Sequence, residues 1–292
     1  MEFANRFGLS CALALPVNQD SSIDYIRLGN HARRLLQTGC SSVTVFGTTG
    51  EGASIDLPER ERILDTLAVA GIEFQRRVVG GVMATSVECA VAQARLLLDR
   101  NCRGTLLTPP FYFKQVTDEG LYRWFSELFH KLRQPRDIIL YHIPSVTQVP
   151  LSIELIGRLK TAFPEVIAGV KDSGGDWSYT EKLIRSHGDL ILLIGDERHL
   201  AAGVRLGAQG AISGLANVCP EILRKLIKSG EENPQIVELV NEVLRFPVIP
   251  AVKALIACAE TDPAWLNVRP PLMELKEPDL GYLVGTYRRL MS

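Results

Sequence analysis

Eight short, largely apolar segments alternate with longer helical patterns from the start of the chain to about residue 215. We predict strands at Ser10–Leu15, Ser42–Phe46, Arg77–Val82, Gly104–Thr108, Asp137–Tyr141, Val166–Lys171, Leu190–Ile194 and Gln209–Ser213. We predict the intervening helices at Ile23–Thr38, Leu57–Gly71, Val87–Arg100, Asp118–Leu132, Ile153–Phe163, Thr180–Ser186 and His199–Leu206. Successive strands are spaced close to the roughly 30 residues of a βα unit, and this repeat restricts the possible folds more than any single motif.

Many of these strands are apolar on both faces, as expected when parallel neighbours and helices cover them. Eight such units favour an α/β fold closed into a (β/α)8 TIM barrel over an open doubly wound sheet. After Pro220 we predict only helices, at Glu221–Lys228, Pro234–Leu244, Val252–Ala259 and Leu280–Met291. Because no flexible linker intervenes, we expect residues 1–219 to form the catalytic barrel and residues 220–292 a helical extension packed on it.

Composition and charge exclude several classes of protein. Hydrophobic residues make up 46% and charged residues 22% of the chain, as in a globular protein with a large core. The net charge of −1 creates no overall attraction to nucleic acid or to an anionic membrane, and no apolar stretch is long enough to span a bilayer. The six cysteines form no C-x-x-C pair and follow no secretory segment, so we expect a soluble cytoplasmic protein.

Lys171 ends an apolar strand, Ile-Ala-Gly-Val-Lys, whereas most other lysines lie in amphipathic or charged stretches. Alternation along the strand places Gly169 on the same face, where it leaves space for the long side chain. A lysine in a barrel mouth is desolvated, which can bring its pKa from about 10.4 toward roughly 7–8 and free the amine to attack a carbonyl. The alternative is a surface lysine that reaches solvent or pairs with Asp172.

Tyr141 ends the preceding strand, and a phenol there is a suitable proton donor to an alkoxide or carbinolamine oxygen. With an ordinary pKa near 10, it is a poor base unless a hydrogen-bond chain passes its proton on. It could equally be a core tyrosine. The neighbouring His142 is an alternative base, although no second histidine or carboxylate lies at ligand spacing, so we expect no metal.

Two glycine-containing segments follow other strands. Gly47, Thr48 and Thr49 begin a G-x-x-G-x-G turn whose backbone N–H groups could hold a carboxylate or phosphate. Neither a dinucleotide fingerprint nor a P-loop has this spacing, and by itself the segment is a turn. Asp196 and Glu197 follow the seventh strand, and Ile212 and Ser213 lie in the glycine-rich eighth. The two carboxylates could bind substrate hydroxyls or simply begin a solvated helix.

In combination these motifs resemble the dihydrodipicolinate synthase / N-acetylneuraminate lyase family of pyruvate-dependent class I aldolases. The segments that carry the resemblance, in order, are Gly47–Glu51, Thr108–Tyr112, Tyr141–Pro144, Gly169–Ser173, Gly210–Gly214 and Val268–Leu272. The resemblance implies that Lys171 forms an imine with a keto acid and that Tyr141 is the acid/base group beside it. It further implies that Thr48 relays protons to a Tyr112 from a neighbouring subunit, which predicts a homotetramer built as a dimer of dimers.

The same resemblance assigns the pyruvoyl carboxylate to backbone amides at Thr48 and Thr49. One departure from the pattern concerns the substrate. Val146 stands where dihydrodipicolinate synthases have an arginine that binds a second carboxylate, and a charge-assisted contact is lost with it. His142 replaces the usual asparagine, and Phe113 replaces a tyrosine of the sialic-acid enzymes.

We therefore expect a lyase that forms or cleaves a 2-keto acid, either a 2-keto-3-deoxy sugar acid or a sialic-acid-like compound, with pyruvate as donor or product. We expect small-molecule partners and no cofactor beyond the covalent imine on Lys171. One alternative is dihydrodipicolinate synthase, which condenses pyruvate with aspartate semialdehyde. Another is a catalytically weak keto-acid sensor, although a pure binder needs neither the lysine nor the relay. A third, a phosphate- or nucleotide-binding barrel, rests on the glycine turns alone.

Overall fold

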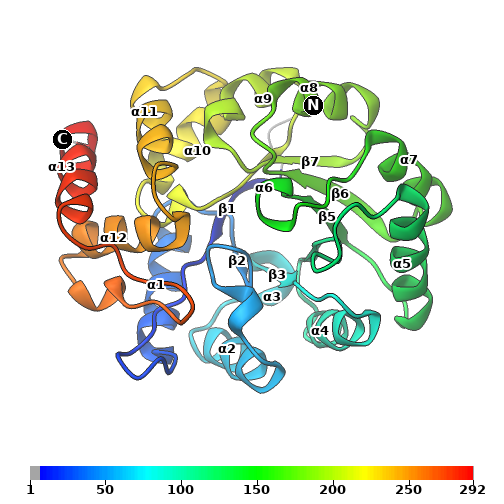
Figure 1. Cartoon of the computed structure of the whole chain (residues 1–292), viewed down its shortest axis with the longest axis horizontal. Coiled ribbons are helices and arrows are strands. Elements are labelled where there is room, and N and C mark those ends of the chain that lie inside the picture. The colour runs from blue at the N-terminus through cyan, green and yellow to red at the C-terminus, as the bar shows by residue number, and fades with distance from the viewer. Residues whose placement is uncertain (1–6, 292) are drawn as a thin grey trace.

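The protein is a closed barrel of eight parallel strands surrounded by helices (Figure 1). The structure is a computed structural model and describes residues 7–291. The strands are β1 (Gly8–Ala12), β2 (Ser42–Val45), β3 (Val78–Val82), β4 (Gly104–Leu107), β5 (Ile138–His142), β6 (Ile167–Asp172), β7 (Ile191–Ile194) and β8 (Gly210–Ser213). Each strand pairs with its sequence neighbours, and β8 returns to pair with β1. The predicted (β/α)8 barrel is therefore confirmed.

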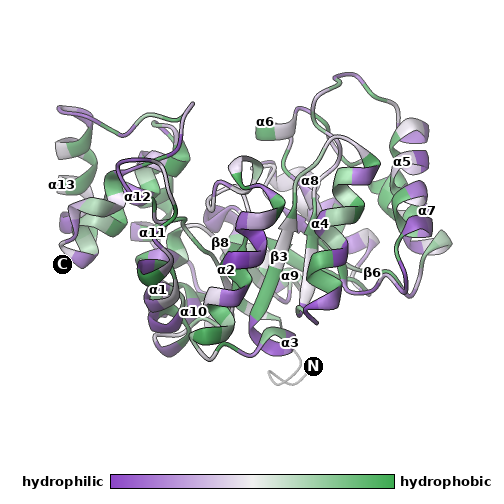
Figure 2. Cartoon of the chain, turned by 90° about the horizontal axis from the view of Figure 1, so that it is seen from below, coloured by the Kyte–Doolittle hydropathy of each residue, from purple (hydrophilic) through white to green (hydrophobic). Residues whose placement is uncertain are grey.

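Helices cover the outside of the barrel, and most of them follow a strand directly. They are α1 (Tyr25–Gln37), α2 (Leu57–Val69), α3 (Phe74–Arg77), α4 (Val87–Asp99), α5 (Asp118–Lys131), α6 (Pro144–Thr147), α7 (Ile153–Ala162), α8 (Trp177–Ser186) and α9 (Leu200–Leu206). Several begin at a side-chain cap, because Ser86, Thr117 and Ser152 each accept a first-turn backbone N–H. Their apolar sides face the strands and their polar sides face outward (Figure 2).

The last quarter of the chain is helical, with α10 (Pro220–Ser229), α11 (Pro234–Val243), α12 (Val248–Glu260) and α13 (Asp279–Met291). The helix predicted at Val252–Ala259 begins earlier, at Val248, because Pro250 lies in the first turn, where no N–H is required. Helix α10 packs on β1 and α9, as the eighth helix of such a barrel does. The boundary we placed at residue 220 stays a prediction, although this packing joins α10 to the barrel.

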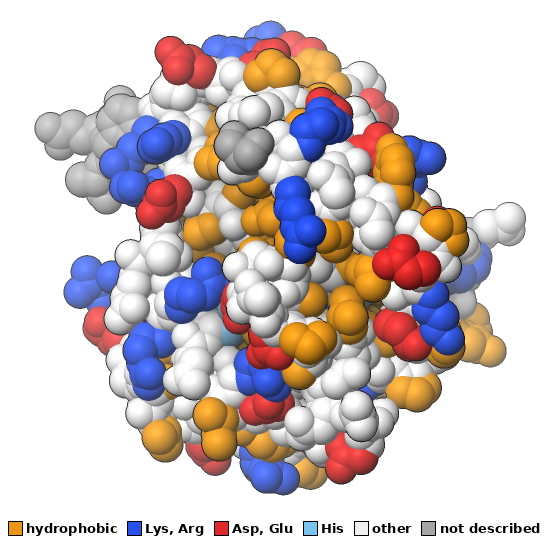
Figure 3. Space-filling view, turned by 90° about the vertical axis from the view of Figure 1, so that its left-hand side faces the viewer, with side chains coloured by type: hydrophobic (Ala, Val, Ile, Leu, Met, Phe, Trp, Pro, Cys, Tyr) orange, Lys and Arg blue, Asp and Glu red, His pale blue; other side chains and the backbone are white. Residues whose placement is uncertain are grey.

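Helices α11, α12 and α13 gather on one side of the barrel (Figure 1). Helix α11 packs on the short 3-10 helix Glu197–His199 after β7, and α12 packs on the 3-10 helix Leu215–Asn217 after β8. The outer face of this region carries side chains of both charges interspersed with apolar ones (Figure 3). These contacts bring the C-terminal helices to the end of the barrel where the strands finish.

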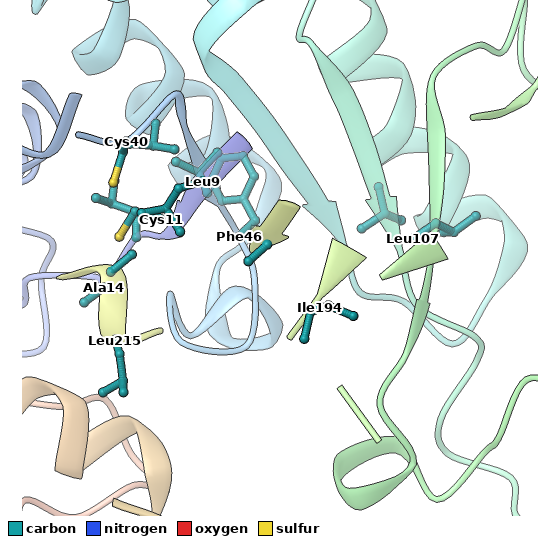
Figure 4. Close-up of a cluster of buried hydrophobic side chains, with 14 of the residues drawn as sticks. Leu9, Cys11, Ala14, Cys40, Phe46, Leu107, Ile194 and Leu215 are labelled. Atoms are coloured by element: carbon teal, nitrogen blue, oxygen red, sulfur yellow. The ribbon is translucent and has the colours of Figure 1, made fainter. Parts of the chain in front are cut away.

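Two apolar clusters hold the fold together. A smaller one fills the barrel interior and includes Val79, Leu106, Ile139 and Leu193. A larger one lies between the strands and the helices, and Figure 4 shows part of it, with Leu9 among the labelled side chains. Both faces of the strands are thus covered, as their continuous apolar sequences predict. The interior is packed, so a ligand can enter only where the strands end.

Candidate active site

Lys171 and Tyr141 meet inside the barrel mouth. Strands β5 and β6 pair in parallel with Tyr141 opposite Lys171, so both side chains enter the interior at the same level. Lys171 Nζ donates a hydrogen bond to Tyr141 Oη at 3.0 Å and lies 4.2 Å from the centre of the ring. Lys171 is 5% exposed and Tyr141 2% exposed. The alternatives of a surface lysine and of a pair with Asp172 are therefore wrong.

The groups around Lys171 and Tyr141 set the pKa of the Tyr141 phenol. Burial by itself raises the pKa of the Tyr141 phenol. The positive charge and hydrogen bond of Lys171, together with the Thr48 and Ser173 hydroxyls, outweigh burial and bring that pKa below its ordinary value. A phenol of lowered pKa beside an amine can exchange a proton with it more easily than an isolated phenol can.

Gly195, rather than Gly169, makes room for the lysine. A side chain at Gly169 would approach the Ile191 carbonyl oxygen of β7 to 2.3 Å, so this glycine is required by strand packing. A side chain at Gly195 would lie 1.9 Å from Ser173 Oγ and 3.0 Å from Lys171 Cε. Our assignment of that space to Gly169 was therefore wrong, because sequence alternation within β6 gives no information about the loop after β7.

The segment from Gly47 to Gly52 forms a tight turn above β2. The Gly52 N–H donates to the Gly47 carbonyl at 3.0 Å, and a side chain at Gly52 would approach Phe46 O to 2.0 Å. Within this turn, Thr48 Oγ1 lies 3.4 Å from Tyr141 Oη. Thr48 and Thr49 line the cavity that contains Lys171, whereas Gly47 closes the turn and does not line it.

The polar residues after β7 and β8 are held mainly by each other. Ser213 Oγ donates to Glu197 Oε1 at 2.5 Å, and burial raises the pKa of Glu197 although this hydrogen bond opposes it. Burial also acts to raise the pKa of Asp196, but hydrogen bonds and charge from Arg198 bring it below its ordinary value. Asp196, Glu197 and Ile212 line the cavity, while Ser213 lies behind Glu197. The two carboxylates do begin a helix, because Asp196 caps the 3-10 helix Glu197–His199, but they are largely buried and partnered rather than solvated.

The cavity at this site has a volume of about 180 Å³. Sequence analysis missed two groups of its residues. Ser173 Oγ is shielded from solvent and has no hydrogen-bond partner of good geometry within the described chain, although it lies close enough to Tyr141 to help lower the pKa of that phenol. It was signalled only as the last residue of the Gly169–Ser173 motif. Val240, Val243, Leu244, Val248 and Val252, from α11, α12 and the residue after α11, form one side, which we call the aliphatic wall. No local signal marks the wall, because it depends on helix packing.

The structure also gives the positions of Tyr112, Val146 and His142, to which the sequence analysis assigned roles or departures from the family pattern. Tyr112 is 73% exposed, packs edge-on against Phe113 and does not line the cavity within a single subunit. Val146 lines the cavity mouth. His142 is buried, stacks on Tyr179 and accepts the Leu151 N–H at its Nδ1, while burial lowers its pKa below the ordinary value despite the nearby Asp172 carboxylate. These contacts occupy His142 away from Lys171.

Two further statements apply to residues 7–291. No three His, Cys, Asp or Glu side chains in this range gather as a possible metal site. In the same range, no helix combines the length and the apolar composition that crossing a membrane requires.

A (β/α)8 barrel with a buried lysine and tyrosine at the carboxyl ends of adjacent strands defines a class of lysine-dependent barrel enzymes. The chain belongs to the Dihydrodipicolinate synthetase family, whose model matches residues 5–283. Members of this family are pyruvate-dependent lyases that hold their substrate as a lysine Schiff base without a metal, and the chain is accordingly a pyruvate-dependent lyase.

Individual relatives span nearly the whole chain. An uncharacterized DapA-like lyase of Chloroflexus aurantiacus is 30% identical, covering 98% of this chain and 97% of its own. The crystal structure of dihydrodipicolinate synthase from Agrobacterium tumefaciens is 49% identical, with a TM-score of 0.96, covering 98% of this chain and all of that one. A variant of Sulfolobus solfataricus 2-keto-3-deoxygluconate aldolase, 20% identical with a TM-score of 0.84 and covering 97% of this chain and 96% of its own, shares the fold.

Proposed function

We propose that this lyase uses Lys171 to cleave a 2-keto acid reversibly into pyruvate and an aldehyde. The observation that carries the proposal is the 3.0 Å hydrogen bond from Lys171 Nζ to Tyr141 Oη, buried in a cavity where the strands end. An amine in its neutral form attacks a ketone, and a phenol within hydrogen-bond reach supplies and removes the protons that imine formation requires.

The reaction begins when the Lys171 amine adds to the keto carbon and water leaves, which gives a positively charged imine. The bond between C3 and C4 of the substrate then breaks, and its electron pair moves toward the imine nitrogen to form an enamine. The C4 hydroxyl loses its proton to the Tyr141 phenolate, and the aldehyde departs. Protonation of the enamine at C3 and addition of water release pyruvate and restore the amine.

Tyr141 needs a route for its proton. We assign Thr48 as the relay, because its hydroxyl lies 3.4 Å from Tyr141 Oη, and a Tyr112 from a neighbouring subunit as the next member. The exposure of the Tyr112 and Phe113 pair supports a role in contact with another copy, and the proposed assembly is a homotetramer. The turn that begins at Gly47 would place backbone amides at Thr48 and Thr49 against the pyruvoyl carboxylate.

For the rest of the substrate we favour a 2-keto-3-deoxy acid of the sugar-acid or sialic-acid kind, with Asp196, Glu197, Ile212 and Ser213 forming or supporting its subsite. The alternative, condensation of pyruvate with aspartate semialdehyde, is favoured by the 49% identity to an enzyme called dihydrodipicolinate synthase. Val146 argues against it, because an apolar side chain cannot bind a second carboxylate. A cytoplasmic location is part of the proposal and agrees with six free cysteines.

Borohydride reduction in the presence of pyruvate, followed by peptide mass mapping, tests the proposal. We expect wild-type protein to carry one pyruvate-derived adduct on Lys171, Lys171→Ala to carry none and the exposed-lysine control Lys276→Ala to behave as wild type. An adduct elsewhere, or none, would refute the assignment. Trapping without turnover of any 2-keto acid would support the sensor alternative, and protection by phosphate but not pyruvate would support the phosphate-binding one.

A further inference from the structure

We propose that the aldehyde partner is short, uncharged and hydrocarbon at its far end, and that this end packs on the aliphatic wall. The inference rests on the proposed function and names its substrate more narrowly. The wall consists of five aliphatic side chains on one side of the cavity, Val240, Val243, Leu244, Val248 and Val252. Leu244 is 48% and Val248 41% exposed, so the described chain leaves part of this apolar surface uncovered at the cavity mouth.

The charges in the cavity disfavour an anionic aldehyde. Among the described residues that line it, Lys171 is the one cation, and imine formation occupies it. Arg198 lies nearby but binds Asp196 through Nε at 2.9 Å and Nη2 at 2.6 Å. A carboxylate or phosphate at the far end of the aldehyde would therefore meet Asp196 and Glu197 without a free cation to balance it.

Beyond Lys171 and Tyr141, the polar side chains that line the cavity in the described chain are those of Thr48, Thr49, Ser145, Ser173, Asp196 and Glu197, and none of them belongs to the aliphatic wall. Asp196 already binds Arg198, and Glu197 Oε1 accepts from Ser213 Oγ. Ser173 Oγ is shielded and lacks a hydrogen-bond partner of good geometry within the described chain, so it can serve one substrate hydroxyl, such as the one that the aldehyde carries beside its carbonyl carbon. A hydroxyl at the far end of the aldehyde would face the wall, where a polar group without a partner is unfavourable.

The size of the cavity also favours a short aldehyde. The part of the site bounded by the wall has a volume of about 180 Å³, smaller than the roughly 300–1,000 Å³ of pockets that hold drug-sized ligands, and the second cavity that adjoins it at Thr48, Ile143 and Val146 does not reach the wall. A substrate of a few heavy atoms beyond the pyruvoyl unit fits this space better than a nine-carbon sugar. Terminally deoxygenated hydroxyaldehydes combine small size, one hydroxyl near the reacting carbon and a methyl end.

The test compares aldehydes that differ in one feature, with purified full-length protein and saturating pyruvate. Lactaldehyde and glyceraldehyde differ only by a terminal hydroxyl, while glyceraldehyde 3-phosphate and aspartate semialdehyde add charge. We expect kcat/KM for lactaldehyde to exceed that for glyceraldehyde by about tenfold and that for the charged aldehydes by more. Equal or better turnover of glyceraldehyde, or best turnover of a charged aldehyde, overturns the inference.

A matched pair of variants assigns the preference to the wall. Val248→Thr keeps the side-chain shape and adds a hydroxyl, and we expect it to lower the lactaldehyde to glyceraldehyde ratio about threefold or more. Val69→Thr makes the same change on the exposed outer face of α2 and should leave the ratio unchanged. An unchanged ratio in Val248→Thr, with an unchanged Tm, overturns the role of the wall.

Pyruvate trapping separates the two proposals. If pyruvate is not trapped on Lys171, the proposed function itself fails. If it is trapped but these aldehydes do not react, or the preferences are reversed, only the aldehyde inference fails.

Discussion

Replacing Lys253 by methionine should destabilise the protein strongly. Lys253 on α12 and Glu51 in the turn after β2 form an ion pair at 2.5 Å, with both side chains fully buried. Burial lowers the pKa of Lys253 below its ordinary value, although the Glu51 carboxylate opposes the shift. Removal of one partner from a buried pair leaves an uncompensated charge and commonly costs about 3–5 kcal/mol. Because Arg269 N still donates to Glu51 Oε2 at 3.0 Å, we expect the lower part of this range.

Thermal unfolding measures this loss. An unfolding entropy of about 2.1 cal/mol/K per residue, taken over 292 residues, converts the expected loss of about 3–4 kcal/mol into a Tm decrease of about 5–7 °C. Lys276→Met, which removes a lysine at the surface, is the matched control and should shift Tm by less than about 1 °C.

A double variant tests whether the missing charge is the cause. Glu51→Gln combined with Lys253→Met removes both charges, and we expect at least half of the lost Tm to return, since a neutral buried pair carries no desolvated ion. The reasoning is refuted if Lys253→Met lowers Tm by under about 2 °C, or if the double variant is less stable than either single one.

Three other changes probe the site and its surroundings. Tyr141→Phe should reduce kcat by about 10²–10⁴ while pyruvate still binds, and full activity would exclude its proton-transfer role. Gly195→Ala should also lower kcat, because the added carbon would displace the lysine or the Ser173 hydroxyl, and an unchanged kcat would contradict the crowding seen there. Glu260 accepts from His31 and Arg34, and although burial opposes them, these contacts bring the pKa of Glu260 from 4.5 to about 2. A carboxylate with a lowered pKa stabilises the fold above pH 4.5 and loses this contribution between about pH 4.5 and 2. The Tm difference between wild type and Glu260→Gln should therefore shrink across this range, and a difference that persists at its lower end would contradict the assignment.

Much of the fold follows from local sequence because each βα unit repeats the same pattern. The strand at Val166–Lys171 was predicted within a residue of the observed Ile167–Asp172, and Lys171, expected in the barrel mouth because it ends an apolar strand, is buried there. The residues at which strands begin and end were harder to predict than the strands themselves. The first strand was expected at Ser10–Leu15 but lies at Gly8–Ala12, because an apolar run continues beyond the point where ladder pairing stops.

The parts of the site that could not be predicted depend on contacts between distant segments. Glu51 and Lys253 are separated by 202 positions, and neither has a sequence neighbour that indicates the other. The pairing of Glu197 with Ser213 was also missed, because adjacent acids in a sequence are ordinarily a solvated loop. Strand periodicity gives the direction of a side chain, whereas its partners are set by loop packing.

The catalytic lysine and the aliphatic wall come from different parts of the fold, so the wall can be changed by engineering without altering the strand that carries the lysine. Lys171 sits in a strand that is hydrogen-bonded on both sides, while the wall belongs to helices that the barrel ladder does not include. Libraries restricted to Leu244 and Val248 should therefore yield catalysts that keep the imine chemistry yet accept new electrophiles, and the retained adduct with pyruvate provides a first screen for such libraries.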